Sequence, residues 1–220
     1  MQIDLKLKKT LQSGARRFEL DLRLESPAQR IVIHGPSGAG KSALLKLIAG
    51  LMKPDEGHLR IGGQTWFDSS SQINHRPQSR QLGYLFQDYA LFPHLTVRQN
   101  IGFGLTKNWT NPHRSVMDER IAYWLNAFSL NGLEHQLPAD LSGGQRQRTA
   151  LARTLITQPK LLLLDEPFAA LDIDLRVQLR QELDQLQQQL GIPMILITHD
   201  LEDIRAFGDA VYCMRDGLLS

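Results

Sequence analysis

The eight residues GPSGAGKS, from Gly35 to Ser42, constrain the fold of this chain more than any other feature of its sequence. They match the pattern G-x-x-x-x-G-K-[ST], in which glycines let the backbone wrap around phosphate groups. The stretch RIVIHG before them is a short apolar run typical of a buried parallel strand. The stretch KSALLKLIAGL after them predicts a helix that ends near Gly50. A glycine loop between such a strand and a helix indicates a phosphate-binding loop in an open α/β sheet.

The chemistry of this loop suits a nucleotide. Lys41 offers a point charge to the β- and γ-phosphates, and Ser42 places a hydroxyl on Mg²⁺. A chance glycine turn would not need both flanking elements, so we prefer the functional interpretation. The predicted ATP-binding residues of the loop are Gly35, Pro36, Ser37, Gly38, Ala39, Gly40, Lys41 and Ser42.

The rest of the pattern predicts a sheet covered by helices on both faces. Apolar and polar residues alternate over residues 3–7 and again over residues 18–24. This pattern indicates two antiparallel strands. The runs KLLLLDEP, PMILITHD and AVYCMRDG indicate later strands with helices between them. We expect one domain over 1–220, with a P-loop NTPase core at 1–87 and 157–220. Its sheet is mixed and mainly parallel, with an N-terminal antiparallel β-subdomain and an inserted α-helical subdomain at 88–156.

Charge and cysteine usage narrow the possible classes. The formal net charge of +2 is too small to argue for nucleic acid as a partner. Cys213 is the one cysteine of the chain, so no internal disulfide and no cysteine metal site are expected, which suits a reducing, cytosolic compartment. The N-terminus alternates in polarity and does not read as a signal peptide. Apolar runs such as LLLL are far below the 18 or so residues that span a bilayer.

Carboxylates and a histidine follow two of the predicted strands. Asp165 and Glu166 come at the edge where ligands of open α/β sheets bind, and His199 follows ILIT at the same edge. We expect Asp165 to hold Mg²⁺ and Glu166, facing the other way, to polarise an attacking water. Taken singly, a strand-capping Asp-Glu pair or a lone histidine is more often structural. Gln87 in LFQDYALF taken alone is equally well a surface glutamine.

A second glycine turn poses a problem. LSGGQRQRTALARTLI, beginning at Leu141, places two glycines before a basic helix, which is again a good cradle for anions. One small chain has no evident need for two phosphate-binding loops.

The order of these motifs resolves the problem by resemblance. GPSGAGKS, LFQDYALF, LSGGQ, LLLLDEP, AALD and ITHD resemble, in this order, the nucleotide-binding subunit of ATP-binding cassette (ABC) transporters. The resemblance implies an ATPase with Glu166 as catalytic base, His199 at the γ-phosphate, and Mg²⁺ held by Ser42, Gln87 and Asp165. It further implies a signature loop and a seam residue that complete the ATP site, namely Ser142, Gly143, Gly144, Gln145 and Asp172.

In this family two copies pack head to tail, and the signature loop of one closes over the ATP held by the other. The second loop therefore serves the neighbouring copy. The family further implies transmembrane permease subunits, indirectly a solute-binding protein, and a peripheral location on the cytoplasmic side of the inner membrane.

The segment HRPQSRQLGYLFQDYALFPHLTVRQNIGFGL resembles importers, most closely those for molybdate and related oxyanions. Its apolar and aromatic residues are expected to lie exposed in a groove that receives a permease helix. Packing inside the helical part is the other interpretation. The residues concerned are Tyr89, Leu91, Phe92, Pro93 and His94.

Several alternatives remain beside the importer. Another importer, an exporter or lipoprotein-release subunit, and a lone ATPase are kept open, whereas DNA-acting relatives carry coiled coils or cysteine modules that are missing between Lys41 and Ser142. The family often stacks an aromatic residue on adenine, and Phe18 is the available one, although it suits a core strand equally well. The chain is expected to lack the C-terminal regulatory domain of some relatives.

Overall fold

The computed structural model describes residues 2–14, 16–106, 111–113, 118–169 and 171–220. Within that part of the chain the strands form one eleven-stranded sheet in the order β6-β5-β4-β1-β2-β11-β10-β3-β9-β8-β7. The strands are β1 (Ile3–Ser13), β2 (Arg16–Ser26), β3 (Arg30–His34), β4 (Glu56–Ile61), β5 (Gln64–Asp68), β6 (Ile73–Asn74), β7 (Leu82–Leu85), β8 (Leu161–Asp165), β9 (Met194–Ile197), β10 (Ala210–Arg215) and β11 (Leu218–Leu219).

Six α-helices and three 3-10 helices connect the described strands. The α-helices are α1 (Lys41–Ala49), α2 (Val97–Gly102), α3 (Glu119–Ala127), α4 (Gly143–Leu155), α5 (Ile173–Leu190) and α6 (Leu201–Phe207). The 3-10 helices are η1 (Pro77–Arg80), η2 (Phe103–Leu105) and η3 (Pro138–Asp140). The α-helical subdomain predicted at 88–156 includes residues 107–110 and 114–117, which lie outside the described part of the chain.

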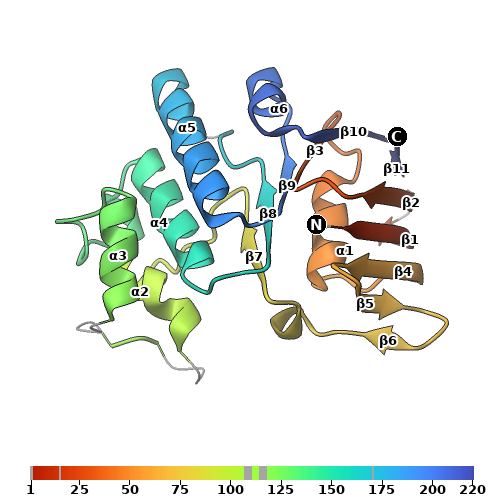
Figure 1. The fold of residues 1–220 in the computed structure, drawn as a ribbon, viewed down its shortest axis with the longest axis horizontal. Coiled ribbons are helices and arrows are strands. Elements are labelled where there is room, and N and C mark those ends of the chain that lie inside the picture. The colour runs from red at the N-terminus through yellow and green to blue at the C-terminus, as the bar shows by residue number, and fades with distance from the viewer. Residues whose placement is uncertain (1, 15, 107–110, 114–117, 170) are drawn as a thin grey trace.

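The mixed α/β architecture expected from the sequence is confirmed. Strands β10, β3, β9, β8 and β7 are parallel neighbours, whereas β1 pairs antiparallel with β2 and with β4. Figure 1 shows the antiparallel strands at one end, the helices α2, α3 and α4 at the other, and the parallel strands between them. Strands β5, β6, β7 and β11 were not predicted, because they are short and lack a long alternating pattern.

Two hydrophobic cores lie on opposite faces of the parallel strands. Along β8, Leu162 and Leu164 belong to the core shared with α2–α6, whereas Leu161 and Leu163 belong to the core shared with α1, β1 and β2. Successive residues of a strand face opposite sides, so a strand buried on both faces must be apolar throughout. This requirement explains why LLLL and MILI were readable as buried strands.

The parallel arrangement decides where the polar residues gather. Strands β3, β8 and β9 run side by side in the same direction, so the residues that follow them meet at one edge of the sheet. The phosphate loop follows β3, Glu166 follows β8, and His199 comes two residues after β9. In the described part of the chain no helix is long and apolar enough to cross a membrane.

Candidate functional site

The loop between β3 and α1 has a backbone shape that glycine makes possible. Gly35 has φ 147°, and an ideal Cβ there would lie 2.0 Å from the carbonyl oxygen of Met214. Gly40 caps α1 in the left-handed region with φ 102°. A side chain at Gly35 would collide with backbone, so the two glycines let the chain turn tightly into the N-terminus of α1, where free N–H groups attract anions.

The lysine and serine that begin α1 are held by the site itself. The Lys41 Nζ donates to the carbonyl oxygens of Gly35 at 2.8 Å and Pro36 at 2.9 Å, so the ammonium lies within the curve of the loop. The Ser42 hydroxyl donates to Asp165 Oδ1 at 3.1 Å. The structure therefore brings the loop and the end of β8 together, as the sequence predicts.

Asp165 is a buried carboxylate at the end of β8. It is 5% exposed, and burial is the main reason that its pKa lies above the ordinary value. The hydrogen bond from Ser42 opposes this rise, the charge of Glu166 adds to it, and Lys46 and a 3.5 Å contact from the Tyr84 hydroxyl oppose it again. A cation placed beside Asp165 would stabilise the charge that burial disfavours.

The hydroxyl, carboxylate and amide oxygens expected for Mg²⁺ line one open pocket of about 640 Å³. Oxygen ligands of this kind fit Mg²⁺, which binds through one or two protein ligands and the phosphates of a substrate. Lys46 lines the same pocket one helical turn after Ser42, a neighbour that the i, i+4 spacing could have revealed. The lining residues are Ser42, Lys46, Phe86, Gln87, Asp88, Asp165 and Ala169.

Glu166 owes its direction to a turn and not to strand alternation as expected, because β8 ends at Asp165. Glu166 adopts φ 47°, which costs a residue with a side chain about 1–2 kcal/mol. Its N–H donates to Ile197 O at 3.0 Å. Its carboxylate oxygen Oε2 lies 3.4 Å from His199 Nδ1, with the two side chains 18% and 63% exposed. The predicted base and the predicted phosphate-contacting histidine therefore lie side by side.

The signature residues lie elsewhere on the chain. Ser142 and Gln145 form a reciprocal cap, in which each side chain accepts the other residue's N–H, at 3.3 and 2.8 Å. An ideal Cβ on Gly144 would lie 2.5 Å from Leu175, whose N–H donates to Asp172 Oδ1 at 2.9 Å. The signature turn and Asp172 thus meet at the start of α5. Among the described residues, none from 142–145 lines the pockets that contain Ser42 or His199.

The first aromatic residue of the loop after Gln87 is not exposed, although the sequence predicts an exposed groove there. Tyr89 is 6% exposed and packs in the core with α2–α4, so its predicted exposure is wrong. Tyr89 and Ala90 have positive φ values of 62° and 44°, and the guanidinium of Arg153 donates to both of their carbonyl oxygens, at 2.7 and 2.8 Å. No sequence motif pointed to Arg153, because this residue acts by contacting the Tyr89 carbonyl, which lies 64 positions earlier in the chain.

The remaining residues of the predicted groove are partly or fully exposed. Leu91 and Phe92 are half-buried, whereas Pro93 and His94 are exposed. The Phe92 ring lies 4.2 Å from that of Phe103. A pocket of about 390 Å³ opens there, lined by Leu82, Gly83, Tyr84, Phe86, Ala90, Phe92, Phe103, Gly104, Arg153, Thr154 and Thr157.

Phe18 lies next to the phosphate loop but does not stand free. Its Cε1 is 3.3 Å from an ideal Cβ on Gly40, and the half-buried ring packs against the core around α1. Both interpretations of Phe18, a core strand residue and a platform for adenine, remain compatible with this position.

Comparison with known proteins shows which family the sequence matches. Residues 19–169 match the protein family described as ABC transporter. The sulfate/thiosulfate import ATP-binding protein CysA of Synechocystis sp. is 44% identical over 198 residues, covering 90% of this chain and 54% of that protein. The Fe(3+) ions import ATP-binding protein FbpC of Pseudomonas fluorescens is 45% identical over 201 residues, covering 90% and 55%. The chain therefore spans about half of the length of the curated relatives it matches.

A solved structure has the same fold. The dimeric post-hydrolysis state of the ATP-binding cassette MJ0796, bound to ADP and Pi, is similar with a TM-score of 0.81 and 30% sequence identity. The similarity covers 99% of this chain and 96% of that one.

Proposed function

The chain belongs to the ABC transporter family, and on this premise we propose that it is an ATP-hydrolysing subunit that powers import across a membrane. The observation that carries the proposal is the joining of the phosphate loop to the end of β8 through Ser42 and Asp165, 3.1 Å apart. Beside that contact lie the paired carboxylate and imidazole of Glu166 and His199. A phosphate cradle, a metal carboxylate and a base at one sheet edge are the parts that phosphoryl transfer to water requires.

Binding of ATP falls to the phosphate loop and the N-terminus of α1. The loop N–H groups and Lys41 hold the phosphates, with the lysine exchanging the loop carbonyls for phosphate oxygens. Ser42, Gln87 and Asp165 hold Mg²⁺, which neutralises phosphate charge when bound. The buried carboxylate of Asp165 gains more from a cation than an exposed one would.

Hydrolysis is assigned to the pair at the ends of β8 and β9. Glu166 accepts the proton of the attacking water, and His199 contacts the γ-phosphate. The turn that holds Glu166 at φ 47° fixes the direction of its carboxylate. Position and charge, rather than a covalent intermediate, lower the barrier.

The site is completed by a second copy of the chain. We assign Ser142, Gly143, Gly144, Gln145 and Asp172 to the ATP held by the neighbouring protomer in a head-to-tail dimer. The separation of this group from Ser42 and His199 within one chain supports that assignment, and the similar cassette MJ0796 was solved as a dimer.

The partners on the membrane side are permease subunits. We assign the pocket around Phe92 and Phe103 to a permease helix. We also propose that the chain is a peripheral subunit on the cytoplasmic side of the membrane. The transported solute is proposed to be molybdate or a related inorganic anion. CysA is named for the import of sulfate and thiosulfate and FbpC for that of Fe(3+) ions, so these relatives support an import subunit and do not choose the solute.

The proposal is tested by the ATPase activity of the purified chain and of Glu166→Gln. The glutamine keeps the size of the side chain but cannot accept a proton, so hydrolysis should fall by about a hundredfold or more. Binding of a fluorescent ATP analogue should remain within a few fold of the wild type. Glu56→Gln on β4, an exposed glutamate far along the sheet, is the matched control and should hydrolyse ATP normally. Normal turnover by Glu166→Gln would contradict the assignment.

A further inference from the structure

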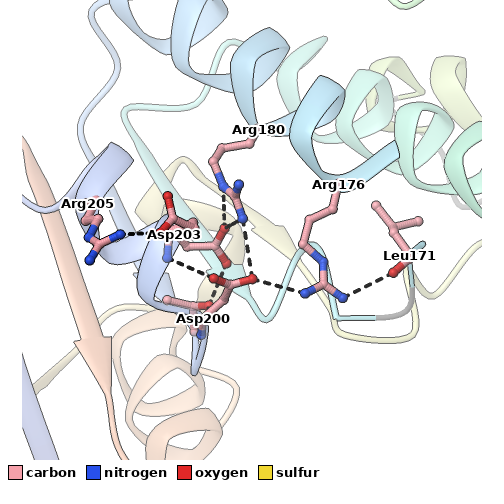
Figure 2. A network of polar contacts seen from close by, with 8 residues as sticks. Leu171, Arg176, Arg180, Asp200, Asp203 and Arg205 are labelled. Carbon is pink, nitrogen blue, oxygen red and sulfur yellow. Dashed lines mark hydrogen bonds and ion pairs between the residues drawn. The ribbon is translucent and has the colours of Figure 1, made fainter. Parts of the chain in front are cut away.

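A network of charged side chains ties α5 to α6, as Figure 2 shows. One of its members, Asp200, directly follows His199 in the chain. The Arg176 Nη1 donates to Asp200 Oδ2 at 3.0 Å. The Arg180 Nε donates to Asp203 Oδ1 at 2.7 Å, and its Nη2 contacts Asp200 Oδ2 at 3.4 Å. Two arginines of α5 thus hold two aspartates at the start of α6, immediately after the histidine.

Arg176 differs from Arg180 because it also reaches a second loop. Its Nη2 donates to the carbonyl oxygen of Leu171 at 3.1 Å, a contact visible in Figure 2. Leu171 directly precedes Asp172, which caps α5 and is assigned to the seam between two copies. One guanidinium therefore contacts both the seam loop, defined here as Leu171–Asp172, and the loop that carries His199.

The histidine loop is held on both sides of His199. The Thr198 hydroxyl donates to Asp203 Oδ2 at 2.6 Å, and the Asp200 N–H donates to the Thr198 hydroxyl at 3.0 Å. Arg176 also lines the same small recess as Glu166 and His199. A change in the position of Arg176 would therefore reach both residues that are assigned to hydrolysis.

The geometry requires a guanidinium at this position. The two terminal nitrogens of Arg176 bond to acceptors on different loops, and the rigid fork of arginine presents its donors at fixed angles. A lysine has one compact ammonium on a flexible stem and would not hold both acceptors in the same way. The Arg176 side chain is 28% exposed and that of Asp200 22%, so water competes only in part for these bonds.

We propose that Arg176 is a positioning residue that couples the seam loop to His199. When Asp172 meets a second copy, the carbonyl of Leu171 and the carboxylate of Asp200 move as one unit through the guanidinium, and His199 is set beside the γ-phosphate. The coupling rests on the proposed function, since it regulates the same ATP site. It makes hydrolysis depend on dimer closure, because the histidine is aligned only when the seam is engaged.

Hydrogen exchange on the full-length chain tests the coupling without any reference to activity. Arg176→Lys should speed amide exchange several-fold in two peptides, one containing residues 171–175 and one containing 198–200. Arg180→Lys should speed exchange in the second peptide alone, because the Arg180 guanidinium donates to Asp203 and Asp200 and not to Leu171. The control is Arg30→Lys. Arg30 also bridges two carboxylates, those of Asp184 and Asp209, but it lies at the end of β3 that is away from the phosphate loop. Unchanged exchange at 171–175 in Arg176→Lys would overturn the proposal.

Kinetics then test the consequence for the reaction. Arg176→Lys should lower kcat about tenfold with the KM for ATP within about twofold, because small misplacements of reacting groups slow chemistry strongly. In a His199→Ala background, Arg176→Lys should change kcat less than twofold, since both substitutions remove the same positioning of the His199 side chain. Additive losses would mean that Arg176 acts otherwise and would overturn the coupling. A wild type without ATPase activity would instead contradict the proposed function, and the exchange result would still decide this inference.

Discussion

Several residues at and beside this site carry buried polar side chains. The cost of burying each one is offset by hydrogen bonds from residues on other helices, strands or loops. Asp165 is 5% exposed and receives the Ser42 hydroxyl, and Asp203 is 2% exposed and receives both Arg180 and Thr198. An unpaired buried carboxylate would be strongly destabilising. Asp203 receives a guanidinium and a hydroxyl, whereas within the described part of the chain the hydrogen bonds to the Asp165 carboxylate come from hydroxyl groups alone. This contrast separates a carboxylate that is paired with a cationic side chain from one that suits a bound cation.

Asp200 offers a test of this reasoning by pH. Burial disfavours its charge, but the Glu202 N–H and the guanidinium groups of Arg176 and Arg180 outweigh burial and lower the pKa of Asp200 below 3.8. The stabilisation is therefore complete above the unfolded pKa and is lost as the pH falls through the lower folded pKa. Asp200→Asn keeps an oxygen for the Glu202 N–H and removes only the charge.

We expect Asp200→Asn to lower the free energy of unfolding by about 1.5–3 kcal/mol at neutral pH. The difference from the wild type should shrink in acid as the pH falls through the folded pKa of Asp200, where the carboxyl of the folded wild type becomes neutral as well. Urea denaturation of both proteins at neutral and acid pH measures this. A difference that stays constant across the two conditions would mean that the charge of Asp200 does not stabilise the fold.

The site residues that could be predicted from the sequence are those that a phosphate-binding motif requires at fixed positions along the chain. Lys41 and Ser42 are readable because a phosphate loop needs them at fixed places after its glycines. Arg153 and Arg176 were not readable, since each acts on backbone carbonyls that are set by the fold. Tyr89 was wrongly predicted to be exposed, because an aromatic residue in a loop reads alike whether it faces a partner or the core.

At the scale of elements, the end of α1 is secured by an unusual cap. Arg80 from η1 is 1% exposed, and its guanidinium donates to the carbonyl oxygens of Leu47 and Ile48, at 3.1 and 2.6 Å. Burial lowers the pKa of Arg80 to about 10, so the side chain remains charged at neutral pH. A positive charge suits the negative end of a helix dipole. Arg80 therefore fixes the helix that begins at the phosphate loop.

Arg80→Met should lower the free energy of unfolding by about 1–3 kcal/mol, because the carbonyls of Leu47 and Ile48 lose the guanidinium donor while the volume of the side chain is nearly kept. Arg23→Met on β2, whose arginine is 67% exposed, should change it by less than about 0.5 kcal/mol. Urea denaturation of the two variants and the wild type provides the comparison. Equal stability of the two variants would show that the cap contributes nothing.

Helices α4 and α5 pack closely at Gly144, where there is no room for a side chain. A Cβ on Gly144 would lie 2.5 Å from Leu175 Cδ2, so Gly144→Ala should cost about 1–3 kcal/mol from overpacking. Leu175→Ala makes room, and in that background Gly144→Ala should become neutral or stabilising. A double-mutant cycle by thermal unfolding measures the coupling, and independent, additive effects would argue against the contact.

The elements that could be predicted were those with a long or uniform pattern. Strands β1 and β2 alternate over many residues, whereas β9 and the first four residues of β8 are apolar, so both kinds were recognised. Strand β7 is short and includes a glycine, and it becomes a strand because Leu82–Leu85 pairs with β8. Pairing with a distant partner cannot be read from a four-residue segment alone.

At the scale of the whole molecule, the proposed site residues fall into two separate groups. The phosphate loop, Asp165, Glu166 and His199 gather at the ends of the parallel strands. The signature turn and Asp172 meet at the start of α5. A single copy thus presents two halves of a site that do not face one pocket, and two copies arranged head to tail would join unlike halves twice.

Sedimentation of Glu166→Gln under saturating MgATP tests this central claim most directly. Since the variant binds but does not hydrolyse ATP, we expect a stable dimer with nucleotide and a monomer without it. Adding Ser142→Arg should return the protein to a monomer while ATP binding persists, because the arginine disturbs only the half-site lent to the neighbour. A monomer for Glu166→Gln at saturating MgATP, with binding verified, would contradict the account.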